Sequence, residues 1–219
     1  MTETSNQHKH GQGRTCVITR RACFSSSHRY WLPELSTDEN SASFGACAIA
    51  PGHGHNYELI VSMSGELDQD GMVLNLSEVK KHIKCEVIDP LNFRFLNDVW
   101  PEFDLSQDNG CLPTTEALVR VIWTRLKLSL PIVSLRLYEH PRLWADYLGN
   151  AMEAYLTLRT HFAAAHRLAR EELTQEENEK IYGKCARPNG HGHNYLVDIT
   201  VHGSIDKRTG MVCDLAALQ

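Results

Sequence analysis

The 219-residue sequence lacks the features of several large protein classes. It has no run approaching the ~20 apolar residues of a membrane-spanning helix. Its polar N-terminus, residues 1–14, lacks the apolar segment of a signal peptide and is expected to be a disordered tail. The net charge is −5 and there is no basic run, which argues against nucleic acid as a partner. We therefore expect neither membrane nor nucleic-acid binding.

Cysteine is present, but without the spacing of a disulfide framework. The chain has seven cysteines, an odd number, and no secretory signal, so we expect reduced thiols and a cytoplasmic protein. Most have no motif around them and are expected to be buried small apolar side chains. Cys47 and Cys185 differ from the others because they share a position in an internal repeat.

The repeat is defined by one cysteine, one upstream histidine and a His-Gly-His motif. Each returns 138 residues later in the chain: Cys47, His28, His53 and His55 become Cys185, His166, His191 and His193. The residues between these positions differ considerably, so the constant spacing indicates a repeat of domain size. We therefore divide the chain into a first repeat, residues 15–148, and a second, truncated repeat, residues 150–219.

Periodicity in the first repeat predicts a mixed helix and strand pattern. Strands are expected over residues 15–24, with His28 just past the end, and over 58–64, with the hairpin continuing at 72–74. A helix is expected from about residue 76 to 86, ended by Pro90. A second helix starts at Thr114 or Thr115, and strands follow at 134–139 and 143–147. The apolar face of the second helix carries Leu118, Val121, Ile122 and Leu126.

The second repeat predicts only a hairpin and the start of a helix. Strands are expected over 152–162 and 195–202, with a helical turn in 171–182 and an N-cap at Asp214. An isolated two-stranded hairpin is marginally stable at best. Either the chain is a fragment, or this half-domain relies on the first repeat or on another subunit.

The histidine pattern predicts a metal site. Two histidines at i and i+2 on an extended backbone point to the same side. With the upstream histidine they give three ligands, the count typical of catalytic zinc, which keeps one coordination position open. Cys47 has two possible roles, as the fourth ligand of a closed structural site or as a thiolate base or nucleophile beside the metal.

Several segments of the first repeat resemble the 6-pyruvoyl-tetrahydropterin synthase family. They are residues 24–29, 44–57, 71–76, 114–116 and 137–139. The second repeat, from residue 182 to 218, resembles only the first half of the family pattern. The related 6-carboxytetrahydropterin synthases usually have a shorter gap between the cysteine and His-Gly-His. The five-residue gap after Cys47 favours the pyruvoyl branch.

This resemblance implies an α+β tunnelling fold, with two helices on one face of a four-stranded antiparallel sheet. It implies homo-oligomers, commonly hexamers, that associate through their sheets and have active sites at the interfaces. The implied substrate is a small-molecule pterin triphosphate, 7,8-dihydroneopterin triphosphate, and the implied cofactor is Zn2+. The implied zinc ligands are His28, His53 and His55 in the first repeat and His166, His191 and His193 in the second.

The resemblance also implies residue roles. Cys47, and Cys185 in the second repeat, would move protons as catalytic bases while triphosphate leaves by elimination. Glu139 would pair with the N–H edge of the pterin ring. Thr114, Thr115 and Glu116 would line the pterin pocket, although these residues also fit a simple helix cap.

One departure from the family pattern stands next to the first site. The family typically has Asp-His after Pro-Leu, whereas Asn92 and Phe93 follow Pro-Leu here, and neither side chain accepts a proton near neutral pH. Three functions therefore stay open. They are 6-pyruvoyl-tetrahydropterin synthesis, 6-carboxytetrahydropterin synthesis of the queuosine and deazaguanine pathway, and a zinc- and pterin-binding pseudoenzyme subunit.

Overall fold

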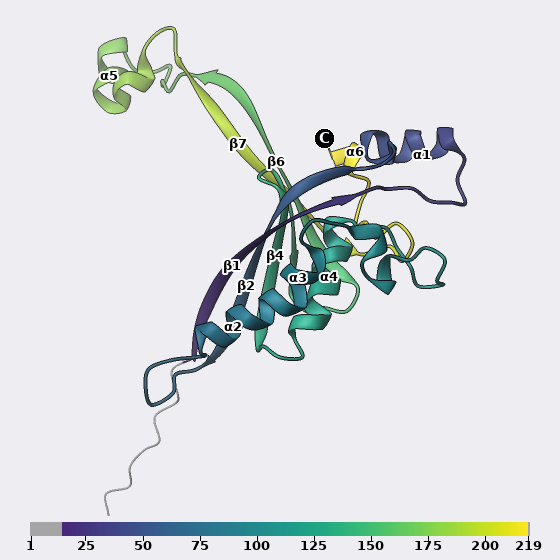
Figure 1. The fold of residues 1–219 in the computed structure, drawn as a ribbon. Coiled ribbons are helices and arrows are strands. Elements are labelled where there is room, and N and C mark those ends of the chain that lie inside the picture. The colour runs from purple at the N-terminus through teal and green to yellow at the C-terminus, as the bar shows by residue number, and fades with distance from the viewer. Residues whose placement is uncertain (1–14, 219) are drawn as a thin grey trace, which may run out of the picture.

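The computed structural model describes residues 15–218, and one seven-stranded sheet runs through them (Figure 1). The strand order is β3-β1-β2-β4-β5-β6-β7, antiparallel throughout except that β3 pairs in parallel with β1. The strands are β1 Thr15–His28, β2 His53–Glu66, β3 Arg94–Phe95, β4 Ile132–His140, β5 Leu143–Tyr147, β6 Glu153–His166 and β7 His191–Ser204. The predicted disordered tail, residues 1–14, lies outside the described residues.

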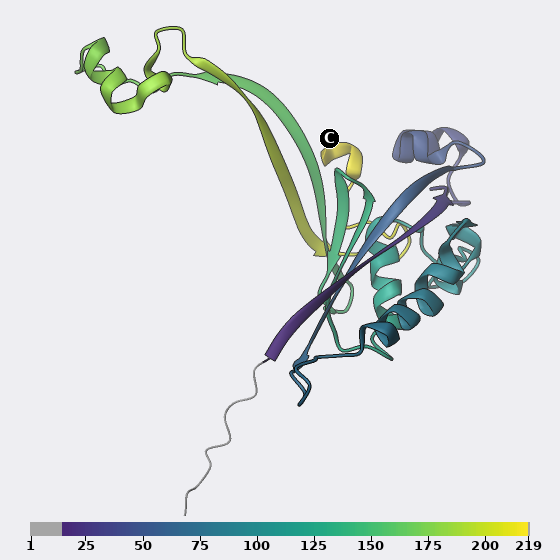
Figure 2. The ribbon, with the colours of Figure 1, turned by 60° about the vertical axis from the view of Figure 1, so that its left-hand side comes forward.

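The helices fall into two groups. Helix α4, and α2 together with its continuation α3, cover one face of the sheet (Figure 2). Helices α1 and α5 occupy the connections between β1 and β2 and between β6 and β7. Their bounds are α1 Thr37–Phe44, α2 Leu76–Ile83, α3 Asp89–Leu91, α4 Thr115–Leu126, α5 Gln175–Tyr182 and α6 Leu215–Leu218. None of the helices in residues 15–218 is long and apolar enough to cross a membrane.

The predicted four-stranded sheet is wrong for the chain as a whole, although the α+β class is right. The four strands expected of the first repeat are present in the order β1-β2-β4-β5. The hairpin of the second repeat adds β6 and β7 to the edge of β5, and the two-residue β3 adds to β1. A strand edge carries unpaired backbone N–H and C=O groups, so an adjacent hairpin extends the sheet rather than standing alone.

The strands of the first hairpin are longer than predicted. β1 continues past residue 24 to His28, and β2 starts at His53 rather than at residue 58. In the resulting antiparallel ladder His28 lies opposite His53. The ladder satisfies the backbone groups of these Ser- and Gly-rich strand ends, which outweighs their low strand propensity. The extension therefore fixes the position of the candidate ligands.

Other boundaries also differ from the prediction. In the second repeat β6 and β7 extend beyond the strands predicted over 152–162 and 195–202. The hairpin does not continue over residues 72–74, because the Asp68 carboxylate accepts hydrogen bonds from the N–H groups of Asp70 and Met72 in a tight turn. The helix predicted to end before Pro90 continues beyond residue 86 through a π-helical turn, Lys84–Ile88, into α3. Pro90 stands in the first turn of α3, where its missing N–H costs little.

The core lies between the sheet and α2 and α4. Leu59 and Val61 on β2 and Leu135 and Leu137 on β4 alternate inward and are fully buried. The apolar face predicted for α4 is confirmed, because all four of its side chains are fully buried: Leu118, Val121, Ile122 and Leu126. Burying an aliphatic side chain of this size contributes about 1.5–3 kcal/mol. This layer holds β4 and the start of α4 rigidly beside β2.

The second hairpin repeats the first in register. His166 lies opposite His191 on β6 and β7, as His28 lies opposite His53 on β1 and β2. At its base, Ala154 and Leu156 are buried in the common core. The distal part, with α5 at its tip, projects away from the rest of the sheet (Figure 1). The base of the second repeat therefore packs on the first, whereas its histidines do not.

Candidate functional site

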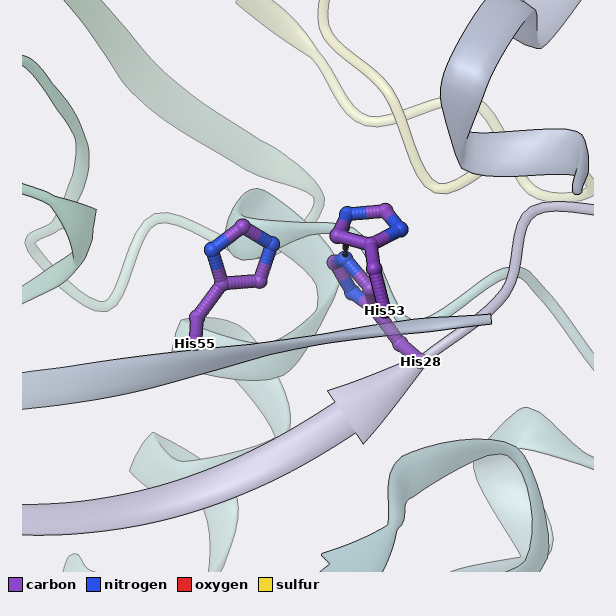
Figure 3. Close-up of side chains that lie close together, drawn as sticks. All are labelled: His28, His53 and His55. Atoms are coloured by element: carbon purple, nitrogen blue, oxygen red, sulfur yellow. Dashed lines mark hydrogen bonds between the residues drawn. The ribbon is translucent and has the colours of Figure 1, made fainter. Parts of the chain in front are cut away.

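Three histidines gather at the end of the first hairpin, His28 from β1 and His53 and His55 from β2 (Figure 3). Their potential ligand atoms all lie within 4.8 Å of one another, and His28 Nε2 lies 3.1 Å from His53 Nε2. Tetrahedral zinc separates two bound imidazole nitrogens by about 3.4 Å. The spacing therefore suits a single metal ion.

His28 is oriented for metal binding by its surroundings. The ring is fully buried, and its Nδ1 lies 3.3 Å from both the Pro113 carbonyl oxygen and the Tyr57 hydroxyl. Because a carbonyl only accepts, Nδ1 carries the hydrogen and the Nε2 lone pair faces the other two rings. Burial lowers the pKa of His28 to about 4, so the ring is neutral at pH 7. The neutral ring is the form that binds metal.

His55 leaves a buried polar atom that a metal ion would satisfy. Its Nε2 is buried without a hydrogen-bond partner, and burial lowers the pKa of His55 from its ordinary value. An unpaired buried polar group costs about 1–3 kcal/mol. The residues present therefore fit zinc, for which three neutral imidazoles are a common donor set.

Cys47 lies beside the triad in a 3-10 turn, Gly45–Ala48. Its Sγ is 3.9 Å from His53 Nε2. The S···N separation in a tetrahedral zinc site is about 3.6 Å, so the distance suits both a fourth ligand and a base next to the metal. Burial, together with the nearby carboxylate of Glu139, raises the pKa of Cys47. The thiol therefore needs a nearby positive charge to ionise near neutral pH.

Glu139 joins the triad to helix α4. Its side chain is 7% exposed at the end of β4, as the inward alternation of that strand predicts. Oε2 accepts a hydrogen bond of 2.5 Å from the Thr115 hydroxyl, and Oε1 lies 3.4 Å from His55 Nε2. A fixed, buried carboxylate next to the candidate metal ligands can accept N–H groups of a small heterocycle.

The residues before α4 form a helix cap and also contact the second repeat. Thr114 is the N-cap, with its side chain accepting from the Ala117 N–H. The Thr114 hydroxyl also lies within hydrogen-bond distance of the Gly210 carbonyl, to which it donates. Glu116 is buried and accepts the Val212 N–H, and burial raises its pKa to about 7. The cap was predicted, whereas the contacts to residues 210–212 were not.

Asn92 and Phe93, which replace the family's Asp-His, lie along the outer edge of β1. The Asn92 side chain accepts the N–H of Ser25, and the Phe93 N–H donates to the Ser25 carbonyl. The Phe93 ring is 82% exposed. Neither side chain is held in the buried cluster of Glu139 and the triad.

The second repeat brings its three histidines together in the same way. His166 Nε2 lies 3.1 Å from His191 Nε2 and 3.2 Å from His193 Nε2, and Cys185 Sγ is 3.8 Å from His191 Nε2. His166 and His193 are exposed, however, and no ion pair joins a carboxylate to this triad within residues 15–218. The ligand geometry is thus repeated without the buried pocket around it.

Tyr57 is a site residue that sequence reasoning missed. Its ring is fully buried and its hydroxyl contacts His28. A signal was present, because Asn-Tyr follows His-Gly-His in both repeats and ends in Tyr57 and Tyr195. In the first repeat this tyrosine packs against Phe24 in a stacked pair, and the second repeat has the equivalent pair.

Comparison with known proteins identifies the family that this chain resembles. A family model described as 6-pyruvoyl tetrahydropterin synthase matches residues 17–150 and 155–219. A human 6-pyruvoyl tetrahydrobiopterin synthase is 36% identical over 146 residues, which cover 64% of this chain and 97% of the human one. A 6-carboxy-5,6,7,8-tetrahydropterin synthase of Haemophilus influenzae is 33% identical over 113 residues, 43% of this chain and 80% of that protein. The solved structure of Caenorhabditis elegans 6-pyruvoyl tetrahydropterin synthase aligns with a TM-score of 0.58 and 28% identity, covering 64% of this chain and 99% of that one.

Proposed function

Because the chain belongs to the 6-pyruvoyl tetrahydropterin synthase family, we propose that its first repeat is a zinc-dependent pterin synthase. The substrate is 7,8-dihydroneopterin triphosphate, and the product is 6-pyruvoyl-tetrahydropterin. Triphosphate leaves by elimination, so the reaction is that of a carbon–oxygen lyase acting on phosphates. The proposed site comprises His28, His53 and His55 with Cys47 and Glu139 around them.

The observation that carries this proposal is the position of one carboxylate. Glu139 Oε1 lies 3.4 Å from a nitrogen of the triad, while Oε2 is held by the Thr115 hydroxyl. A pterin whose ring N–H groups donate to Glu139 would present its side chain to the three histidines. The same contacts orient the ring, because the carboxylate has one oxygen fixed by a buried hydroxyl.

Each protein group then has a defined task. The three neutral imidazoles hold zinc, which would supply a Lewis acid for the hydroxyl oxygens of the substrate side chain. Cys47 Sγ, once ionised, would take the proton from the adjacent side-chain carbon and return it to the pterin ring, so that the side-chain hydroxyl becomes a ketone while the dihydropterin ring is reduced to a tetrahydropterin. Loss of a second side-chain proton would then release triphosphate as the leaving group and leave, after tautomerisation, the second ketone. Tyr57 and the Pro113 carbonyl hold His28 in one tautomer. His28 and Glu139 are buried, whereas His53, His55 and Cys47 are half-buried, so the site stays open to substrate on one side.

Two specific observations support alternative functions. Asn92 and Phe93 lack the acid–base chemistry of the family's Asp-His, which favours a zinc- and pterin-binding pseudoenzyme. The similarity to a protein named 6-carboxy-5,6,7,8-tetrahydropterin synthase favours the carboxy product. The five-residue gap between Cys47 and His53 and the 36% identity to a pyruvoyl enzyme favour the main proposal.

Product identification separates these functions. The zinc-loaded chain is incubated with 7,8-dihydroneopterin triphosphate, and the pterin products and free triphosphate are quantified by mass spectrometry. We expect 6-pyruvoyl-tetrahydropterin with one triphosphate per product. A 6-carboxy product would move the chain to the other branch of the family. Bound but unconverted substrate would identify a pseudoenzyme.

The proposal includes homo-oligomers that associate through their sheets. Within residues 15–218, β7 pairs only with β6, and the outer edge of β1 pairs only at Ser26 and Ser27 with β3. Unpaired strand edges are templates for pairing with another chain. Light scattering of the purified chain tests this association, and a monomer at micromolar concentration would contradict it.

A further inference from the structure

The turn after β7 docks on the segment that leads into α4. The Arg208 carbonyl accepts the Leu112 N–H at 3.2 Å, and the Gly210 carbonyl accepts the Thr114 hydroxyl. The Val212 N–H donates to the Glu116 carboxylate at 3.1 Å. Every second residue of the turn, from 208 to 212, therefore makes a hydrogen bond to every second residue from 112 to 116.

Arg208 anchors this turn to the first repeat. Its Nε and Nη2 donate to the two carboxylate oxygens of Glu34 at 2.7 and 2.8 Å. Its Nη1 donates to the carbonyl oxygens of Leu105 and Gly110. A bidentate pair of this kind fixes orientation as well as distance. All three partners belong to the first repeat, so Arg208 joins residues far apart in sequence.

The docked turn also bounds a cavity of about 400 Å³ between the repeats. Phe44, at the end of α1, lines one side, and Met211 and Val212 of the turn line another. Small-molecule sites are typically about 300–1,000 Å³ in volume. Glu116, whose carboxylate accepts the Val212 N–H, adjoins this wall. The turn is thus part of the surroundings of the residues expected to line the pterin pocket.

The equivalent turn of the first repeat makes no such contact within the described residues. It closes in a similar way, since the N–H of Asp68 donates to the Met72 carbonyl as the N–H of Asp206 donates to the Met211 carbonyl, but the second turn is one residue longer. Met72 is nevertheless 49% exposed, whereas Met211 packs in a cluster with Leu112. Among the described residues, these contacts to the segment before α4 are therefore made by the second turn and not by the first.

We propose that the turn of residues 206–213 is a positioning element that holds residues 112–116, three of which are expected to line the pterin pocket of the first repeat, in place within one chain. Arg208 is its positioning residue, because it carries the contacts that seat the turn. The identity of the ligand as a pterin rests on the proposed function. The positioning itself rests on the contacts between the turn and residues 112–116.

The test compares Arg208→Ala and Arg208→Glu with the charge swap Arg208→Glu/Glu34→Arg in the full chain. Arg159→Ala is the matched control, because Arg159 makes an equally bidentate pair with Asp198, but inside the second hairpin. Amide hydrogen exchange is followed at residues 112–118. The affinity for 7,8-dihydroneopterin, which lacks the leaving group, is measured by fluorescence.

We expect the amide hydrogens of residues 112–118 to exchange faster in both single Arg208 variants. The affinity for the pterin should fall about tenfold, the low end of the effect of losing a charge-assisted hydrogen bond, because the pair is half-exposed. The swap should restore part of both values, because it remakes the ion pair but not the hydrogen bonds from Arg208 Nη1 to the Leu105 and Gly110 carbonyls, and Arg159→Ala should change neither. Exchange at residues 112–118 that stays at the parental rate in both single variants would overturn the proposal. A parent chain that binds no pterin would refute the proposed function, while the exchange rates would still decide whether the turn positions residues 112–116.

Discussion

Glu139 Oε1 lies 3.4 Å from His55 Nε2, so the carboxylate expected to anchor the pterin ring adjoins the atoms expected to hold zinc. Its other oxygen is fixed by Thr115 at the start of α4. Sheet and helix therefore both determine where this carboxylate lies. The proposed ring recognition and the proposed metal binding thus share one position of the first repeat, and no ion pair joins a carboxylate to the second triad among the described residues.

Replacing Glu139 should separate pterin binding from metal binding. Glu139→Gln keeps the shape of the side chain but removes the charge that accepts ring N–H groups. We expect pterin affinity to fall about 10–100-fold, as for loss of hydrogen bonds to a charged group, with the zinc content unchanged. Glu58→Gln is the control, because Glu58 pairs with Arg21 on the other face of the same sheet. Loss of zinc from Glu139→Gln would show that this carboxylate is itself a ligand.

The two roles of Cys47 give opposite results for one substitution. If Cys47 is the base, Cys47→Ala should abolish turnover while His28, His53 and His55 still hold zinc. If it is a fourth ligand, the same change should weaken zinc binding strongly and destabilise the fold, because metal binding then contributes to folding. Zinc content and thermal unfolding are measured together. Cys185→Ala, at the equivalent position of the exposed triad, is expected to leave turnover of the first site unchanged.

Restoring the family's pair next to Pro-Leu should raise the rate where the proposed oligomer brings residues 92 and 93 of one subunit to the site of another, because within one chain they lie outside the cluster of Glu139 and the triad. In Asn92→Asp/Phe93→His the new carboxylate can keep the hydrogen bond from the Ser25 N–H. The imidazole replaces a ring that is 82% exposed, so little packing is lost. General acid–base assistance is worth about 10²–10⁴-fold, and kcat should rise within that range. A doubly substituted chain that binds zinc and pterin but forms no product would support the pseudoenzyme.

Stability should depend on pH through Glu116. Burial raises its pKa from the ordinary value of 4.5 to about 7, so the fold favours the protonated form. Its contribution to the free energy of unfolding, about 3 kcal/mol, is complete below pH 4.5 and is lost as the pH rises through about 7. Urea unfolding from pH 4.5 to 8 should therefore show a decline that Glu116→Gln lacks. Parallel curves for the two proteins would contradict the pKa.

Much of the first repeat could be predicted because its signals are local. The 3.6-residue period of α4, its threonine cap and the inward alternation of Leu135, Leu137 and Glu139 each depend on neighbouring residues only. The histidine clusters could be predicted because the constant spacing of the repeat pointed to shared chemistry. In both hairpins the structure brings together the three histidines that the sequence grouped.

The remainder depends on contacts between distant residues. Serine and glycine near His28 and His53 have low strand propensity, and only the cross-strand ladder extends β1 and β2 through them. The seating of Arg208 on Glu34 joins parts of the chain 174 residues apart. No local pattern encodes such pairings. Tyr57 was missed for a similar reason, since its partner His28 lies on the other strand.

The most direct test of the central claim compares turnover in His28→Ala and His166→Ala, with zinc content measured on the same samples. The account predicts about two zinc ions in the parent chain and about one in each variant, because two histidines alone leave too few ligands. It further predicts that His28→Ala forms no 6-pyruvoyl-tetrahydropterin, whereas His166→Ala keeps the parental rate. Parental turnover in His28→Ala, or its loss in His166→Ala alone, would contradict the assignment of catalysis to the buried triad.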